Sequence, residues 1–242
     1  PIIVEIDTGM GRLGVRYDES DDFLARANNV ANLTVILSHF SESDLQSSDH
    51  TSMQMEKFEN VAIGLDVPRS IANSAAIISG CYDVVDWVRP GLMLYGVSPF
   101  ANSTGADHGL RASMTLESRL IAIRKMRKGD SIGYYSTWCC PEEMPIGIVS
   151  CGYGDGYPRS ICEGTPVIAR DRRAAIIGRI SMDTLAIDLR NLPDCSIGEP
   201  ILLWGDALPI ELIACRAGTI PNQLLAGLTF RVPRRHISLR HL

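Results

Sequence analysis

The 242-residue sequence contains very little lysine: Lys57, Lys125 and Lys128 are the only three. Lys57 falls within a helical pattern whose charged face points to water, and the other two fall where a strand pattern enters a turn. An amine that acts as a nucleophile or base must be held, desolvated, at the end of a core element. The sequence therefore predicts that none of the three lysines is catalytic.

Other features that the chain lacks exclude several classes of protein. No apolar run reaches the ~18 residues of a transmembrane helix, so the sequence predicts no membrane span. The net charge is −5 and the basic residues are scattered, which argues against a nucleic-acid or membrane surface. The seven cysteines form no CxxC pair, which favours reduced thiols over metal ligands. We expect a cytoplasmic protein without a metal.

The chain also lacks an ordinary beginning. Its first residues, PIIVEIDTG, start inside an apolar strand pattern, with neither an initiator methionine nor a signal peptide. Its length and its 45% hydrophobic content still suffice for a substantial core. We therefore expect the C-terminal part of a longer protein.

Short strand and helix patterns alternate over the first 100 residues. Strands are predicted at 2–6 and 33–39, helices at 19–32 and 47–65, and two further strand ends at 70–76 and 84–91. Such alternation is typical of parallel strands with crossover helices. Because four units cannot close an eight-stranded barrel, we expect residues 1–110 to form the C-terminal half of a (β/α)8 barrel.

Residues with useful chemistry follow these strands. Arg12, His39, Asn73 with Ser74, and Arg89 each stand at a predicted strand end, where barrel enzymes place their active sites. Taken singly, His39 is more simply a satisfied core histidine, and the Asn73 region is as consistent with a helix cap as with an anion site. Arg89 follows a buried run and therefore needs a ligand or an ion-pair partner.

The rhythm changes after residue 110. Residues 111–242 read as a mainly antiparallel β domain of short strands broken by Gly, Pro or Asp turns. Two short helices are predicted at 208–218 and 221–228. The predicted strands lie at 114–126, 131–138, 144–152, 165–170, 174–182, 184–189, 200–205 and 231–239.

Seven motifs occur in order along nearly the whole chain: IDTGMGRLG, SHFSESD, IANSAA, VRPGLMLYG, GYYSTW, GYGDGYPR and GRISMD. In this order and at these spacings they resemble alanine racemases, and a chance match to all seven is negligible. The resemblance implies a pyridoxal-phosphate enzyme that interconverts L- and D-alanine and supplies D-alanine for peptidoglycan. It also implies a (β/α)8 barrel followed by a β domain, a homodimer with shared active sites, and a cofactor lysine upstream of this chain.

The resemblance assigns the catalytic and cofactor-binding residues. Tyr134 is the expected catalytic tyrosine, Arg89 faces the pyridine nitrogen, and His39 lies between them. The phosphate is expected on a small set of groups after the third and fourth strand ends: Asn73, Ser74, and the backbone of Gly91 and Leu92.

The same resemblance assigns the substrate contacts. Arg12 and the backbone of Met182 are expected to touch the amino acid, and Tyr153 lines the entrance with Asp183 nearby. Two positions depart from the pattern. Glu5 stands where some relatives carry a carbamylated lysine, and Phe230 where many have a phosphate-binding tyrosine.

The chemistry requires these residue types. Racemisation removes the α-proton on one face and returns one on the other, so a lysine and a tyrosine on opposite faces solve the geometry. A free tyrosine has a pKa of ~10 and needs cationic neighbours to act as a base. An arginine does not surrender its proton, so Arg89 leaves the ring nitrogen unprotonated and limits side reactions.

Other functions stay open. A racemase of the same fold for serine or a broader range of amino acids would differ in residues outside this chain. A related decarboxylase has little support, because its phosphate motif and cysteine context are missing. For this polypeptide alone, the missing lysine favours a non-catalytic interaction module. We expect the chain by itself to be inactive.

Overall fold

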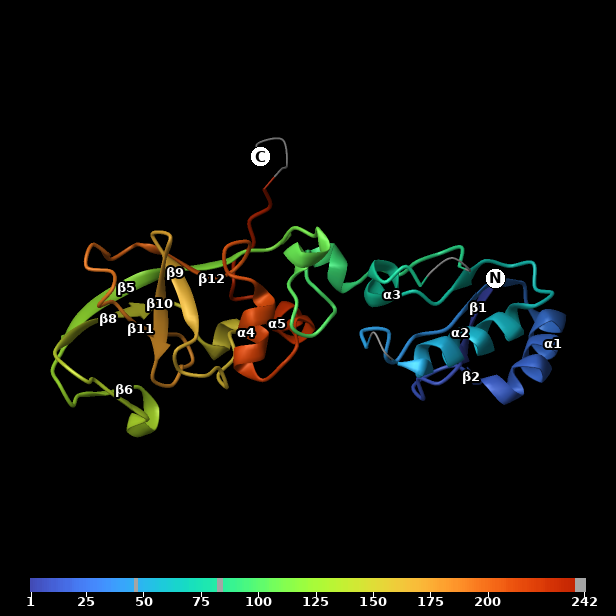
Figure 1. The fold of residues 1–242 in the computed structure, drawn as a ribbon, viewed down its shortest axis with the longest axis horizontal. Coiled ribbons are helices and arrows are strands. Elements are labelled where there is room, and N and C mark those ends of the chain that lie inside the picture. The colour runs from blue at the N-terminus through green and yellow to red at the C-terminus, as the bar shows by residue number, and fades with distance from the viewer. Residues whose placement is uncertain (46–47, 82–84, 238–242) are drawn as a thin grey trace. The chain divides into compact units, whose positions relative to one another are not determined.

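The computed structural model describes residues 1–45, 48–81 and 85–237. Contacts divide the chain into two compact units, residues 1–111 and 112–242. Figure 1 follows the chain through both units. Within the described ranges, the helices are too short or too polar to cross a membrane.

The first unit is built on a parallel sheet with the strand order β2-β1-β3-β4. β1 (Ile2–Asp7) pairs with β2 (Val15–Arg16) and with β3 (Leu33–Leu37), and β3 pairs with β4 (Arg69–Ser70). The parallel sheet is as expected for part of a (β/α)8 barrel, but β2 was not predicted and stands in the sheet without a helix between it and β1.

Helices connect the strands of the first unit. α1 (Ser20–Val30) has acidic residues in its first turn, and α2 (Asp49–Ala62) starts at Ser48, whose hydroxyl accepts a hydrogen bond from the His50 amide. α3 (Ser74–Ile78) is a single short helix after β4. Three 3-10 helices complete the unit: Tyr17–Glu19, Leu92–Tyr95 and Gly105–His108.

The core of the first unit follows from its sequence periods. Val4 and Ile6 alternate inward on β1, and Phe58 and Val61 present one face of α2 to them. The strand β3 is buried along most of its length, as is typical of a parallel strand covered on both faces.

The second unit is a closed antiparallel barrel with the strand order β10-β11-β8-β5-β12-β9. Figure 1 shows β5 as the long strand that runs along this barrel. The six strands are β5 (Leu116–Met126), β8 (Met144–Val149), β9 (Pro166–Ala169), β10 (Arg172–Ile177), β11 (Leu185–Asp188) and β12 (Pro200–Trp204). α4 (Ile210–Ala217) and α5 (Pro221–Gly227) follow. The mainly antiparallel character is as expected, while closure was not foreseen.

Four predicted strand segments are wrong in whole or in part. Of residues 70–76, only Ser70 lies in a strand, and residues 74–76 belong to α3. Residues 131–138 form β6 (Ser131–Ile132), a 3-10 helix (Tyr134–Ser136) and β7 (Trp138–Cys139), because Tyr135 and Ser136 take positive φ angles. Residues 85–91 form no strand, and residue 84 lies outside the described residues. Residues 231–237 are also irregular, since Pro233 has no N–H to donate to a ladder. Residues 238 and 239 lie outside the described range.

Candidate active site

The turn after β1 is fixed by its own aspartate. Asp7 Oδ1 accepts hydrogen bonds from the backbone N–H groups of Gly9 and Gly11, each at 3.0 Å. The Gly11 bond is the main reason that the pKa of Asp7 lies below its usual value. The Asp7 carboxylate thus fixes the backbone of the DTGMGR turn, which carries the exposed Arg12.

Arg89 gathers the ends of two neighbouring strands. Its Nη1 donates to Ser70 Oγ at 2.5 Å and its Nη2 to the Ser38 carbonyl oxygen at 2.6 Å. Nη2 also lies 3.4 Å from His39 Nδ1. Burial lowers the pKa of Arg89 and the charge of Glu5 opposes that shift. The sequence required a partner for this half-buried arginine, and the chain itself supplies several.

The surroundings of His39 favour its neutral imidazole form. Burial lowers its pKa first, and the positive charges of Arg12 and Arg89 lower it further. Glu5, half-buried on β1, opposes the shift. The charges of Arg12 and Arg89 therefore both act on His39.

A residue that the sequence analysis missed supports this region. Gln54 of α2 is completely buried, with 0% exposure. Its Oε1 accepts from the Ser41 amide at 2.9 Å, and its Nε2 donates to the His39 carbonyl oxygen at 2.9 Å. A weaker bond at 3.3 Å reaches Thr8 Oγ1, at the end of β1. Gln54 thus joins α2 to the segments that follow β1 and β3.

Ser74 and Gly91 meet in a second part of the first unit. Ser74 Oγ accepts from the Gly91 amide at 3.0 Å and from the Met93 amide at 3.2 Å. Ser74 is buried, while the Cα of Gly91 faces open space on the side where a side chain would be. Leu92 begins the 3-10 helix beside them.

Asn73 has a defined structural task. Its Oδ1 accepts from the Ala76 amide at 3.1 Å and so caps α3, and Ser43 Oγ donates to the same atom at 2.9 Å. This observation favours the cap for Asn73 itself, while Ser74 presents its hydroxyl to the Gly91 turn.

Tyr134 lines a cavity in the second unit. The cavity has a volume of 360 Å³, and its walls include Ile146, Ile148, Arg179 and Thr184. Tyr134 is 59% exposed and lines this cavity, whereas Tyr135 is 80% exposed and is not among the described residues that line it. The guanidinium of Arg179 lies 5.2 Å from the centre of the Tyr135 ring. Of the two neighbouring tyrosines, Tyr134 is the one that can reach a molecule in the cavity.

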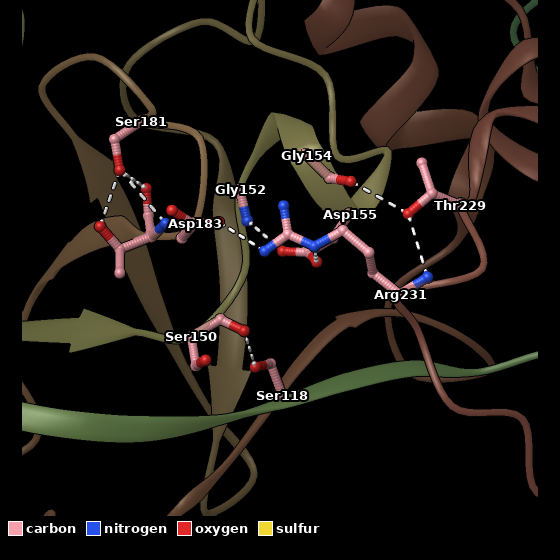
Figure 2. A network of polar contacts seen from close by, with 10 residues as sticks. Ser118, Ser150, Gly152, Gly154, Asp155, Ser181, Asp183, Thr229 and Arg231 are labelled. Carbon is pink, nitrogen blue, oxygen red and sulfur yellow. Dashed lines mark hydrogen bonds and ion pairs between the residues drawn. The ribbon is translucent and has the colours of Figure 1, made fainter.

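Two turns of the same unit, one carrying Tyr153 and the other carrying Met182 and Asp183, are joined by backbone hydrogen bonds. Figure 2 shows Gly152, Gly154 and Asp155 of the first turn and Ser181 and Asp183 of the second. The Tyr153 amide donates to the Ser181 carbonyl oxygen at 3.1 Å, and the Gly154 amide donates to the Met182 carbonyl oxygen at 2.8 Å. These two bonds join the GYGDG turn to the GRISMD turn, which the sequence analysis treated as separate motifs.

Arg231 is a second residue that the sequence analysis missed. It pairs with Asp155 and donates to Asp183 (Figure 2). No spacing rule could connect it to carboxylates about 50–75 positions earlier in the chain. Phe230, beside it, is 98% exposed.

The comparisons with known proteins agree with one another. The family model "Alanine racemase, N-terminal domain" matches residues 1–99, and "Alanine racemase, C-terminal domain" matches residues 113–236. An alanine racemase of Nitrosococcus oceani is 47% identical over 237 residues, which cover 97% of this chain and 66% of that protein.

Solved structures give the same result. The biosynthetic alanine racemase of Pseudomonas aeruginosa is 41% identical with a TM-score of 0.91, over 98% of this chain and 66% of that one. An alanine racemase of Bartonella henselae with covalently bound pyridoxal phosphate is 30% identical with a TM-score of 0.87, over 97% and 66%. This chain therefore spans about two thirds of the length of these relatives.

Proposed function

This chain belongs to the alanine racemase family, and we propose that it contributes to an enzyme that interconverts L- and D-alanine with pyridoxal phosphate. The observation that carries the proposal is the arrangement around Arg89. Arg89 lies within hydrogen-bonding distance of His39 at the strand ends, and the positive charge of Arg12 contributes to the lowered pKa of the same histidine. In the same unit, Ser74 accepts a hydrogen bond from the Gly91 amide.

The first unit has groups that fit the cofactor. The buried Ser74 hydroxyl lies beside the backbone N–H of Gly91, and the space next to the Gly91 Cα is open. Hydroxyl and backbone N–H groups can bind a phosphate without a lysine. Ser74, Gly91 and Leu92 would hold the phosphate, and Arg89 would face the ring nitrogen. Pyridoxal phosphate, when bound, draws electrons from the α-carbon and so acidifies the α-proton.

Arg89 limits what the cofactor can do. A guanidinium keeps its proton, so Arg89 would donate a hydrogen bond to the ring nitrogen of the bound cofactor without protonating it. Its contacts with Ser38 and Ser70 fix its orientation for that task. The weaker electron withdrawal favours proton exchange over transamination.

Tyr134 is proposed to take and return the α-proton on the face used by L-alanine. It borders a cavity lined by apolar side chains and by Arg179. Arg12 is proposed to bind the substrate carboxylate, together with the Met182 backbone. Tyr153 and Asp183 would form the entrance.

The second base is proposed to be a lysine outside this chain. Lys57, which lies on α2, has its Nζ 5.8 Å from the centre of the Tyr17 ring. Lys125 Nζ pairs with Glu143 at 2.6 Å. Lys128 is exposed in the turn after β5. These surroundings support a structural or surface role for each, so we propose that the isolated 242-residue chain does not racemise alanine.

The assembly and setting are part of the same proposal. We propose a homodimer in which Arg12, His39, Ser74 and Arg89 of one subunit face Tyr134, Tyr153 and Met182 of the other. The protein would work in the cytoplasm and provide D-alanine for peptidoglycan. A related racemase for serine or several amino acids is the second candidate, because we expect the residues that distinguish these substrates to lie outside this chain.

The test is a substrate comparison with the longer protein that includes this chain. With pyridoxal phosphate present, L-alanine should be converted to D-alanine faster than L-serine to D-serine. A clear preference for serine would support the second candidate. No turnover of any amino acid, in a protein that contains the upstream lysine, would leave the non-catalytic module as the better reading.

A further inference from the structure

Arg231 lies between two carboxylates that belong to separate turns, the turn of Tyr153 and the turn of Met182 and Asp183 (Figure 2). We propose that Arg231 is a positioning residue: it fixes these two turns against each other and so sets the geometry of the substrate entrance. That these turns form a substrate entrance rests on the proposed function. That Arg231 fixes the two turns against each other does not.

The guanidinium is held at both ends. Its Nη2 donates to Asp183 Oδ1, and its Nε lies 3.5 Å from Asp155 Oδ1. The other oxygen of Asp155 accepts from the Gly152 amide at 2.9 Å, so this carboxylate is fixed to the start of the Tyr153 turn. A planar group with donors in a fixed fork can orient two carboxylates in a way that a lysine ammonium cannot.

Glycines make room for this arrangement. A Cβ at Gly154 would lie 2.2 Å from Arg231 Nη1, and a Cβ at Gly152 would lie 2.4 Å from the Met182 carbonyl oxygen. The backbone of the Tyr153 turn is therefore in direct contact with the guanidinium on one side and with the Met182 turn on the other. At Gly152 the obstructing atoms belong to the backbone, so this close approach requires glycine there, whereas at Gly154 the nearest atom is the end of the Arg231 side chain.

The segment that carries Arg231 is itself anchored to the Tyr153 turn. Thr229 Oγ1 donates to the Gly154 carbonyl oxygen at 3.0 Å, and the Thr229 amide donates to the Asp155 carbonyl oxygen at 3.1 Å. The arginine thus emerges two residues after an attachment point, with little freedom in where its side chain can lie.

The exposure of the Arg231 ion pairs indicates that they orient the two turns rather than stabilise the whole fold. The side chain of Arg231 is 37% exposed and that of Asp183 is 63% exposed, so water competes strongly for this bond. Asp155 is more shielded, at 16%. Pairs as exposed as Arg231 and Asp183 contribute little to global stability, and their main effect is on local orientation.

The experiment compares Arg231→Met and Arg231→Lys with a matched control, Arg190→Met. Arg190 also pairs with two carboxylates of the second unit, Asp188 and Glu142, and contacts neither turn. Backbone hydrogen exchange measured by mass spectrometry reports the Tyr153 and Gly154 amides, whatever the activity. Arg231→Met should speed exchange at residues 153–154 by about tenfold while β8 and β11 stay protected, and Arg190→Met should leave residues 153–154 unchanged.

The catalytic arm uses the longer protein. Because the Tyr153 and Met182 turns are proposed to bind substrate, Arg231→Met should raise KM for alanine by about tenfold with kcat within about threefold, and Arg231→Lys should recover only part of that loss. Unchanged exchange at residues 153–154, or exchange that rises equally throughout the barrel, would overturn the inference. So would normal KM despite faster exchange. If the protein racemises no amino acid, the proposed function fails and the exchange result alone decides about Arg231.

Discussion

Gln54 offers a test of how the first unit holds its strand ends. Replacing it with methionine keeps an unbranched side chain of similar volume and removes every polar contact. The two short bonds, to the Ser41 amide and the His39 carbonyl oxygen, are both 2.9 Å long. Each partner loses its bond in a half-buried setting where water can partly replace it, so about 1 kcal/mol per group, or ~2 kcal/mol in total, is the expected loss.

Thermal unfolding followed by circular dichroism measures this loss. For a chain of this size, ~2 kcal/mol corresponds to a fall in Tm of about 4–8 °C. Gln223→Met makes the same chemical change at an exposed position of α5 and should shift Tm by less than about 2 °C. If Gln54→Met melted at the wild-type temperature or above it, the buried glutamine would not be the anchor that its contacts indicate.

Three further predictions concern charge, assembly and cofactor attachment. The pKa of His39 lies below its usual 6.5, so the stability that its neutral form contributes is complete above that pH and is lost as the pH falls toward the folded-state pKa. His39→Gln should therefore flatten the Tm–pH curve between about pH 7 and pH 5, and an unchanged slope would contradict the assignment. Heterodimers that pair Tyr134→Phe with Arg12→Met subunits should recover activity through one intact site; proven heterodimers without activity would argue against shared sites. Borohydride treatment of the 242-residue chain with pyridoxal phosphate should leave no stoichiometric adduct on any of its three lysines, and a specific adduct on one of them would refute the argument from their surroundings.

The sequence predicted those elements whose residues carry a clear period. The strand at 2–6 and the helix at 47–65 were both predicted, and the structure shows Val4 and Ile6 buried on β1, Phe58 and Val61 buried on α2, and Ser48 as the cap of α2. Gln54 lies on the same face as Phe58, four positions earlier, and a glutamine on an apolar face is a signal that could have been used.

The parts that failed depend on contacts and backbone angles that one sequence does not display. The positive φ of Tyr135 interrupts what looked like a strand, although tyrosine rarely adopts such angles. Closure of the six-stranded barrel depends on pairing β9 with β12 and β10, and only the fold reveals it. Arg231 pairs with Asp155 and Asp183, which lie far from it in the sequence of the second unit, so residue spacing did not indicate its role.

The central claim is that Tyr134 removes the α-proton of L-alanine, and solvent isotope exchange tests it most directly. The longer protein is incubated in D2O with each enantiomer, and α-deuterium is followed by NMR at early times. Tyr134→Phe should slow α-exchange of L-alanine by about 10²–10⁴-fold and leave that of D-alanine within about tenfold of wild type, because the other base still acts. Tyr135→Phe should behave like wild type in both. Wild-type exchange of L-alanine by Tyr134→Phe, or its loss in Tyr135→Phe instead, would contradict the account.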